Sequence, residues 1–106
     1  MSRQIIVLDE AEDELVAAER WYENRRPGLG REFRLAFDEA MERLNAAPLA
    51  ASPLLSIPIA LGAARQIIVK RFPYSVIFIE HESDLWIVAF AHQSRRPGYW
   101  RDRVAK

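Results

Sequence analysis

The chain has 106 residues, half of them hydrophobic, and a formal net charge of zero, which is typical of one small folded domain and unlike a disordered chain. It has no cysteine, which excludes disulfides and thiolate metal sites. The N-terminal sequence predicts no signal peptide, and no run approaches the roughly 18 apolar residues of a membrane span. We therefore expect a single soluble, cytoplasmic domain over residues 1–106 that does not associate with a membrane.

The chain begins with a short predicted strand and a first helix. Residues 3–9, "RQIIVLD", are rich in β-branched side chains and predict the strand. Asp9 then has the position of an N-cap, with Glu12 as its capping-box partner. An apolar stripe at helical spacing follows, formed by Ala11, Leu15, Ala18 and Tyr22. The helix should end in "NRRPGLG", where proline and glycine interrupt the pattern.

A second helix is predicted over residues 29–46. Its apolar stripe consists of Phe33, Phe37, Ala40 and Leu44, and Pro48 ends it. Because only a few residues separate the two helices, they should form an antiparallel hairpin. Residues 48–63, "PLAASPLLSIPIALGA", are rich in proline and predict a connecting loop.

Three strand-like runs follow: "ARQIIVKR", "YSVIFIEH" and "LWIVAFAH". The short turns between them predict an antiparallel meander. The expected fold class is α+β: an N-terminal strand, an antiparallel helix hairpin and a three-stranded meander, with the hairpin on one face of the sheet. Both faces of the middle run are apolar, so we expect the other face to be left uncovered until a partner binds it.

Motifs for metal or cofactor binding are absent from this sequence. The chain has no phosphate-binding loop of the form GxxxxGK[ST], and "GLG" lies between two helices. His81 lies near Glu82 and Asp84, but such a set has too few ligands, and a solvated turn explains it better. We expect neither a metal nor a cofactor.

A basic and aromatic cluster is the main functional signal. Residues 65–106 carry 8 Lys or Arg against 4 Asp or Glu, whereas residues 1–64 carry 7 against 11. The cluster consists of Lys70, Arg71, His92, Arg95, Arg96, Tyr99, Trp100, Arg101 and Arg103. Guanidinium groups match phosphates, aromatic rings stack on bases, and His or Tyr can transfer protons in a metal-free ribonuclease. Alternatively, Tyr99 and Trp100 pack against the helices and have a structural role.

Three motifs of the chain resemble the RelE/ParE superfamily of bacterial toxins: "AEDELVAAERWYENRRPGLGREF", "VKRFPYSVIF" and "VAFAHQSRRPGYWRDR". They occur in the family's order and cover nearly the whole chain. The resemblance implies a toxin of a type II toxin–antitoxin system, held in a hetero-oligomer by a cognate antitoxin. It also implies one of two activities: ribosome-dependent cleavage of mRNA, as in RelE-like members, or inhibition of DNA gyrase by binding, as in ParE-like members.

Individual residues favour the ParE-like branch. The positions that match the basic residues of the nucleases are Gln66, Ile68 and Ser75, none of which is charged. The long helix hairpin also resembles ParE-like toxins and plasmid stabilisation proteins. We therefore expect a gyrase inhibitor that acts by binding and is not an enzyme, although a degenerate toxin without a target is a further possibility. Its expected target-binding residues are Lys70, Arg71, Arg95, Arg96 and Trp100.

The alternative is a RelE-like, metal-independent endoribonuclease. Arg95 matches a phosphate-binding arginine of the nuclease pattern, and Tyr99 or Trp100 lies near its catalytic tyrosine. Some nuclease members use a Glu, Arg and His set instead, which gives His92 a possible role. The catalytic residues of this alternative would be His92, Arg95 and Tyr99.

Overall fold

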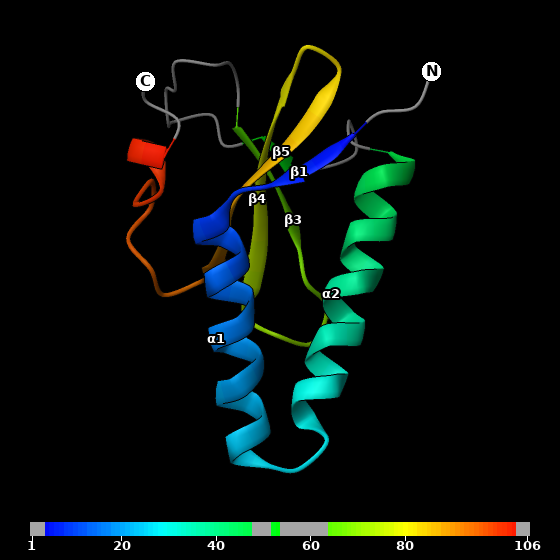
Figure 1. Cartoon of the computed structure of the whole chain (residues 1–106), viewed down its shortest axis with the longest axis vertical. Helices are drawn as coiled ribbons and strands as arrows, with labels where there is room; N and C mark the ends of the chain where they lie inside the picture. Colours follow the sequence, from blue (N-terminus) through cyan, green and yellow to red (C-terminus); the bar gives the residue numbers. More distant parts are fainter. Residues whose placement is uncertain (1–3, 48–51, 54–63, 104–106) are drawn as a thin grey trace.

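Two helices cover one face of a five-stranded sheet in the computed structural model, which describes residues 4–47, 52–53 and 64–103 (Figure 1). The strand order is β1-β5-β4-β3-β2. The elements in chain order are β1 (Ile5–Val7), α1 (Asp9–Arg25), α2 (Leu29–Ala46), β2 (Ser52–Pro53), β3 (Ala64–Ile68), β4 (Tyr74–His81), β5 (Asp84–His92) and the 3₁₀ turn η2 (Arg101–Arg103). The α+β class, the helix hairpin and the meander are as predicted. No helix in this described part combines the length and the apolar character needed to cross a membrane.

The start of α1 differs from the prediction. The N-cap residue is Leu8, which has no side-chain cap, so the prediction of an Asp9 cap with a Glu12 partner was wrong. The Glu12 N–H donates to the Leu8 carbonyl at 3.0 Å, and the Leu8 N–H donates to the Ile87 carbonyl at 3.0 Å. The chain thus passes from β1 into α1 while it is still bonded to β5. Acidic side chains in the first turn take the place of a cap, since they complement the positive end of the helix dipole.

The meander places β4 in the centre of the sheet. Its antiparallel partners are β3, with Ile68 opposite Ser75, and β5, with Tyr74 opposite His92. The register with β5 shifts between Ile77 and Phe78. Because of this bulge, the consecutive residues Val88 and Ala89 belong to the same cluster on one face of the sheet.

The edges of the sheet were not predicted. β1 pairs in parallel with β5, with Ile5 opposite Leu85, because the two helices return the chain to the far side of the meander. β2 lies within the predicted connecting loop and pairs with β3, with Ser52 opposite Gln66. The pairing of β1 stops at Ile87, and no strand of the described residues lies beside β5 on that edge beyond this point.

Each face of the sheet carries a buried apolar cluster. The helix-side cluster joins both helices to the sheet and includes Leu15, Phe33, Phe37, Leu44, Val76, Phe78 and Phe90. The opposite cluster consists of Ala64, Ile77, Ile79, Val88, Ala89 and Trp100. Since Ile79 and Val88 are fully buried, the prediction of an uncovered apolar face was wrong. Among the described residues, the exposed large apolar side chains are Val7, Trp21, Leu35 and Ile68.

Candidate target-binding site

Residues 93–103, here called the C-terminal segment, run from the end of β5 to the N-terminal part of α1. The segment starts with a hydrogen bond from the Gln93 N–H to the Pro73 carbonyl at 2.8 Å, then folds through consecutive tight turns. Gly98 adopts a φ of 77°, a left-handed conformation that glycine permits. Figure 1 shows η2, in red, beside the first turns of α1. Ring and guanidinium groups that are adjacent in sequence are thereby distributed around one end of the sheet.

Two cavities flank the start of this segment. The sheet cavity has a volume of about 240 Å³ and lies against Gln66, Ser75 and Ile77, with residues 91–93 and 95–100 around it. The helix cavity has a volume of about 550 Å³ and lies between α1 and the sheet. Its walls are formed by Glu14, Ala17, Ala18, Trp21, Tyr22, Pro73, Tyr74, Phe90, His92 and Arg95. Among the residues that the structure describes, His92 and Arg95 alone line both cavities.

Arg95 is the exposed arginine of the cluster that lines both cavities. Its guanidinium carbon lies 3.9 Å from the centre of the Tyr99 ring, which is a close cation–π contact. It forms no ion pair with any carboxylate of the described residues. Arg96 is also exposed and lines the sheet cavity. Two guanidinium groups are therefore available to an anionic or polar partner at this cavity.

Glu14 of α1 binds the C-terminal segment to the rest of the fold. Its Oε2 accepts hydrogen bonds from the Tyr99 hydroxyl at 2.5 Å and from Arg103 Nη2 at 3.1 Å. Its Oε1 accepts from the Phe90 backbone N–H at 3.0 Å and from Arg103 Nη1 at 2.9 Å. Arg103 Nη1 also donates to the Val88 carbonyl at 3.0 Å. Glu14 and Arg103 therefore satisfy peptide groups of β5 beyond the point where β1 ends.

These contacts shift the pKa values of Glu14 and Tyr99. Burial raises the pKa of the Glu14 carboxyl, but hydrogen bonds from Arg103, Tyr99 and the Phe90 N–H outweigh it and leave the pKa lowered. Burial and the bond to Glu14 raise the pKa of the Tyr99 hydroxyl. Tyr99 thus donates its proton to a fixed carboxylate and holds it more tightly than a free tyrosine would. In this geometry it supports Arg95 and is a poor proton-transfer group.

The His92 ring lies at the junction of the two cavities. Its Nδ1 accepts a hydrogen bond from the Ser94 backbone N–H at 3.0 Å and lies 2.8 Å from the Ser94 hydroxyl. The ring packs edge-on against Tyr74, with centroids 5.1 Å apart. Because Nδ1 is an acceptor here, the neutral ring carries its proton on Nε2. Among the three residues of the nuclease alternative, His92 is the one whose position suits proton transfer.

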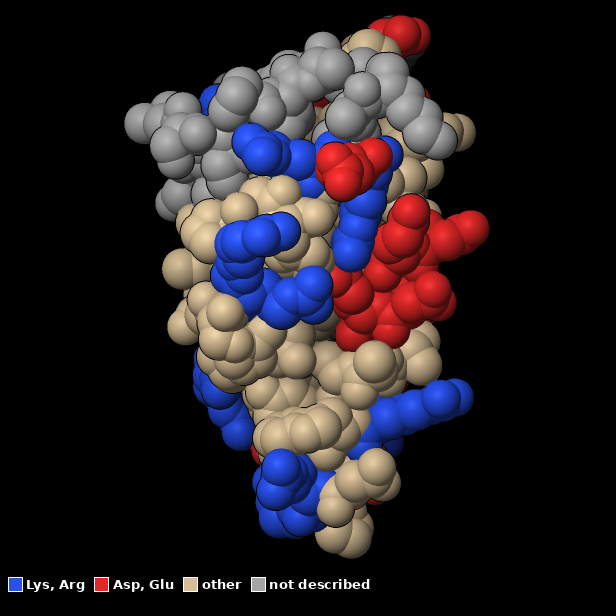
Figure 2. All heavy atoms as spheres, turned by 90° about the vertical axis from the view of Figure 1, so that its left-hand side faces the viewer, with Lys and Arg blue, Asp and Glu red and all other residues tan. Residues whose placement is uncertain are grey.

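The charges of this side of the molecule are sorted into separate patches. Figure 2 shows Lys and Arg atoms in groups above and below a band of uncharged atoms, with Asp and Glu atoms gathered beside the upper group. Acidic residues are concentrated at the start of α1, in Asp9, Glu10 and Glu12. A partner that lies across this face would meet an uncharged band with basic groups on both sides of it.

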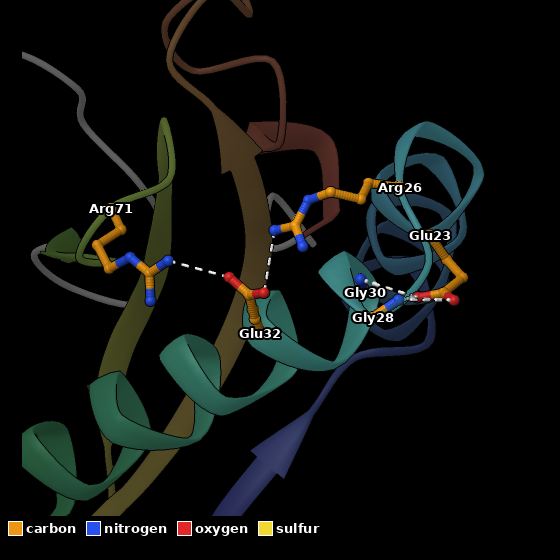
Figure 3. Close-up of polar contacts among 6 residues, drawn as sticks. All are labelled: Glu23, Arg26, Gly28, Gly30, Glu32 and Arg71. Carbon is orange, nitrogen blue, oxygen red and sulfur yellow. Dashed lines mark hydrogen bonds and ion pairs between the residues drawn. The ribbon is translucent and has the colours of Figure 1, made fainter.

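Lys70 and Arg71 line neither cavity. Arg71 forms an ion pair with Glu32 of α2 at 3.0 Å, and Lys70 lies 3.8 Å from Glu39. Glu32 also binds Arg26, so it bridges the β3–β4 turn to the hairpin tip (Figure 3). Although the strand ends are adjacent, as expected, these two side chains turn toward α2. The structure does not place them with Arg95 and Arg96.

The hairpin tip next to Glu32 is built around two glycines. The Glu23 carboxylate accepts hydrogen bonds from the backbone N–H groups of Gly28 at 3.1 Å and Gly30 at 3.0 Å (Figure 3). Gly28 has a φ of 89°. A Cβ at Gly30 would lie 2.9 Å from the Glu19 carbonyl oxygen. The sequence "PGLG" therefore fixes how closely α1 and α2 approach at the tip.

The remaining residues singled out in the sequence differ in burial and in whether they line the sheet cavity. Trp100 is only 2% exposed and packs in the buried cluster opposite the helices. Trp100 also lines the sheet cavity, and its contact with a target stays a prediction. Gln66 and Ser75 line the sheet cavity, whereas Ile68 is exposed outside it. The floor of the sheet cavity is accordingly uncharged.

Glu14 is the site residue that sequence reasoning missed. Its four acidic neighbours, Asp9, Glu10, Glu12 and Asp13, are all exposed, so it appeared to belong to the same charged face. The available signal was its spacing, since it lies three residues after Ala11 and four before Ala18 on the apolar stripe.

In the described residues no three His, Cys, Asp or Glu side chains are grouped to hold a metal ion.

Comparisons with known proteins agree with this architecture. A family model described as "ParE toxin of type II toxin-antitoxin system, parDE" matches residues 5–97. The solved structure "Chromosomal ParDE TA system from P. aeruginosa" has a similar fold, with a TM-score of 0.68 and 15% identity, covering 85% of this chain and 95% of that one. No curated protein matches the sequence significantly. The family match confirms the resemblance seen in the motifs, and the structural likeness confirms the fold.

Proposed function

Because the chain belongs to the ParE toxin family of type II toxin–antitoxin systems, we propose that it arrests growth by binding cytoplasmic DNA gyrase, without cleaving RNA. The observation that carries this proposal is the uncharged floor of the sheet cavity. RNA cleavage requires cationic groups at the scissile phosphate and groups that can donate and accept protons. At the floor of this cavity stand Gln66 and Ser75, and the Tyr99 hydroxyl is already bonded to Glu14.

Binding a protein target requires no proton-transfer groups, and the site has the exposed cationic side chains that binding does require. Arg95 and Arg96 are exposed at the rim of the sheet cavity, and Arg95 is free of ion pairs within the described residues. Exposed arginines beside aromatic rings are common anchors of protein interfaces. A protein target with an acidic surface could therefore bind there without any reaction.

Supercoiling by purified gyrase tests the proposal. The purified chain should inhibit supercoiling, and Arg95→Ala should weaken the inhibition. Arg101→Ala is the matched control, because Arg101 is exposed in the same segment but lines neither cavity. Normal supercoiling in the presence of excess wild-type chain would contradict gyrase as the target.

A second candidate function is ribosome-dependent cleavage of mRNA. It is favoured by the convergence of His92, Arg95 and Arg96 on the sheet cavity. In that case His92 transfers the proton and the two arginines bind the phosphate. Ribosome-bound mRNA would be cut at discrete positions, and both His92→Ala and Arg95→Ala would abolish the cuts. Intact mRNA in a translating extract with excess toxin would exclude this candidate.

The helix cavity is our proposed docking site for the cognate antitoxin. Its walls are mostly apolar, and Trp21 at its edge is 52% exposed. Arg95 supplies a positive charge to the cavity wall, and the Arg25 guanidinium carbon lies 4.3 Å from the Trp21 ring centre. An antitoxin segment with apolar anchors and flanking carboxylates would match this surface.

A further inference from the structure

A short series of contacts connects α1 to the arginine that both cavities share. Glu14 binds the Tyr99 hydroxyl at 2.5 Å, and the Tyr99 ring lies 3.9 Å from the Arg95 guanidinium carbon. We propose that Glu14 is a positioning residue that acts through the Tyr99 ring to hold Arg95 between the sheet cavity and the helix cavity. This inference deepens the proposed function and rests on it only for the role of Arg95 in binding.

Arg95 depends on the ring because little else restrains it. The side chain is exposed, and its backbone forms a turn through the hydrogen bond from its N–H to the His92 carbonyl at 3.0 Å. Within the described residues the guanidinium has no carboxylate partner. A long side chain of this kind samples many rotamers unless a contact selects one. The Tyr99 ring supplies that contact.

The ring in turn depends on Glu14. The carboxylate is itself fixed by the Phe90 N–H and by two hydrogen bonds from Arg103, and both charged side chains are only 17% exposed. The several hydrogen bonds to this half-buried carboxylate hold it in one orientation. Because Tyr99 donates to it, the ring plane is defined by atoms of α1 and β5 and does not depend only on the local turns of the C-terminal segment.

The position of Arg95 matters because the two proposed partners would compete for it. Arg95 lines the sheet cavity, where the target is proposed to bind, and the helix cavity, where the antitoxin is proposed to bind. One guanidinium cannot form its full set of hydrogen bonds in both places at once. Holding it at the junction keeps it available to either partner.

Nuclear magnetic resonance of the full chain tests the positioning directly. Side-chain protons of Arg95 above the Tyr99 ring should be shifted upfield by the ring current, and Tyr99→Leu gives the unshifted reference. Glu14→Gln should remove about half or more of that upfield displacement in the folded protein, since a neutral amide holds Tyr99 and Arg103 less firmly. The matched control Glu12→Gln, at an exposed residue of the same helix, should leave it unchanged.

A purely structural role gives a different result. Glu14→Gln would then lower the melting temperature but leave the Arg95 resonances of the folded molecules in place, and this outcome would overturn the proposal. If Glu14→Gln does not fold, Tyr99→Phe replaces it, because this variant keeps the ring and loses only the hydroxyl. Full retention of the shift in Tyr99→Phe would likewise overturn the proposal.

Growth inhibition separates this inference from the proposed function. If both are correct, Glu14→Gln and Arg95→Ala weaken inhibition, and Glu12→Gln does not. If the wild-type chain fails to inhibit growth, the proposed function is wrong, while the Arg95 resonances still decide whether Glu14 positions the side chain. If Glu14→Gln shifts the Arg95 resonances but keeps full inhibition, the link between this position and binding is wrong.

Discussion

Glu14 and Arg103, which are 89 positions apart in the sequence, form a two-point ion pair that attaches the C-terminal segment to α1. The pair is 17% exposed on each side and also bonds to β5 through the Phe90 N–H and the Val88 carbonyl. The same carboxylate fixes Tyr99, and through it Arg95. The stability of the fold and the arrangement of the proposed binding residues are therefore coupled at one side chain.

Arg103→Ala should lower the free energy of unfolding by about 2–3 kcal/mol, because it leaves a half-buried carboxylate without its charged partner. Denaturant unfolding followed by Trp fluorescence measures this loss. Arg101→Ala, at the exposed neighbour, should stay within about 0.5 kcal/mol of wild type. Equal stability of Arg103→Ala and Arg101→Ala would show that the ion pair does not hold the segment.

The pH dependence of stability should show the lowered pKa of Glu14. A carboxyl whose pKa is lower in the folded state than its unfolded value of about 4.3 stabilises the fold fully above that value. The contribution is lost as the pH falls through the folded pKa. The difference in unfolding free energy between wild type and Glu14→Gln should thus be constant above about pH 5.5 and decline below about pH 4.5.

The difference in unfolding free energy between wild type and Glu14→Gln cancels the contributions of the other titrating groups. Glu32, whose pKa is lowered by Arg26 and Arg71, contributes to both proteins and cancels. A difference that stays flat down to the acid unfolding transition would contradict the assignment of the lowered pKa to Glu14.

Gly30→Ala should destabilise the hairpin by about 1–3 kcal/mol, because the new Cβ would lie 2.9 Å from the Glu19 backbone carbonyl, which cannot move without shifting α1. Thermal unfolding measures the loss. Gly28→Asn is the control, since asparagine tolerates the left-handed conformation and nothing lies within 4 Å of a Cβ there. A larger loss in Gly28→Asn than in Gly30→Ala would contradict the close approach of the two helices.

Trp21→Ala should weaken binding of the cognate antitoxin by roughly 1–3 kcal/mol and change stability little, because the exposed ring forms an edge of the helix cavity. Isothermal titration calorimetry measures the affinity. Leu35→Ala is matched to it, since Leu35 is 56% exposed on α2 and lines neither cavity. Equal loss of affinity in both variants would place the antitoxin elsewhere.

The sequence predicted the parts of this fold that depend on local patterns. The apolar stripe and Pro48 define α2 as Leu29–Ala46, and the short turns define the meander. Pairing between distant segments was not predictable in this way. Nothing local to residues 5–7 indicates a parallel partner in β5, and Pro53 argued against a strand where β2 lies.

In the candidate site, too, local sequence predicted some features, and contacts between distant residues determined the others. Composition identified the segment with His92, Arg95 and Arg96, and the structure brings these three to one cavity. The positions of the remaining residues depend on three-dimensional contacts: Lys70 and Arg71 turn to carboxylates of α2, and Trp100 is buried. Glu14 was hidden among acidic neighbours because its partners lie more than 70 positions away along the chain.

Expression of the chain without its antitoxin tests most directly whether this toxin binds its proposed target and cuts no RNA. A DNA-damage reporter and the 5′ ends of cellular mRNA should be measured in the same cultures. The proposed function predicts induction of the reporter with unchanged mRNA 5′ ends. New, discrete 5′ ends within translated messages, with a silent reporter, would contradict it.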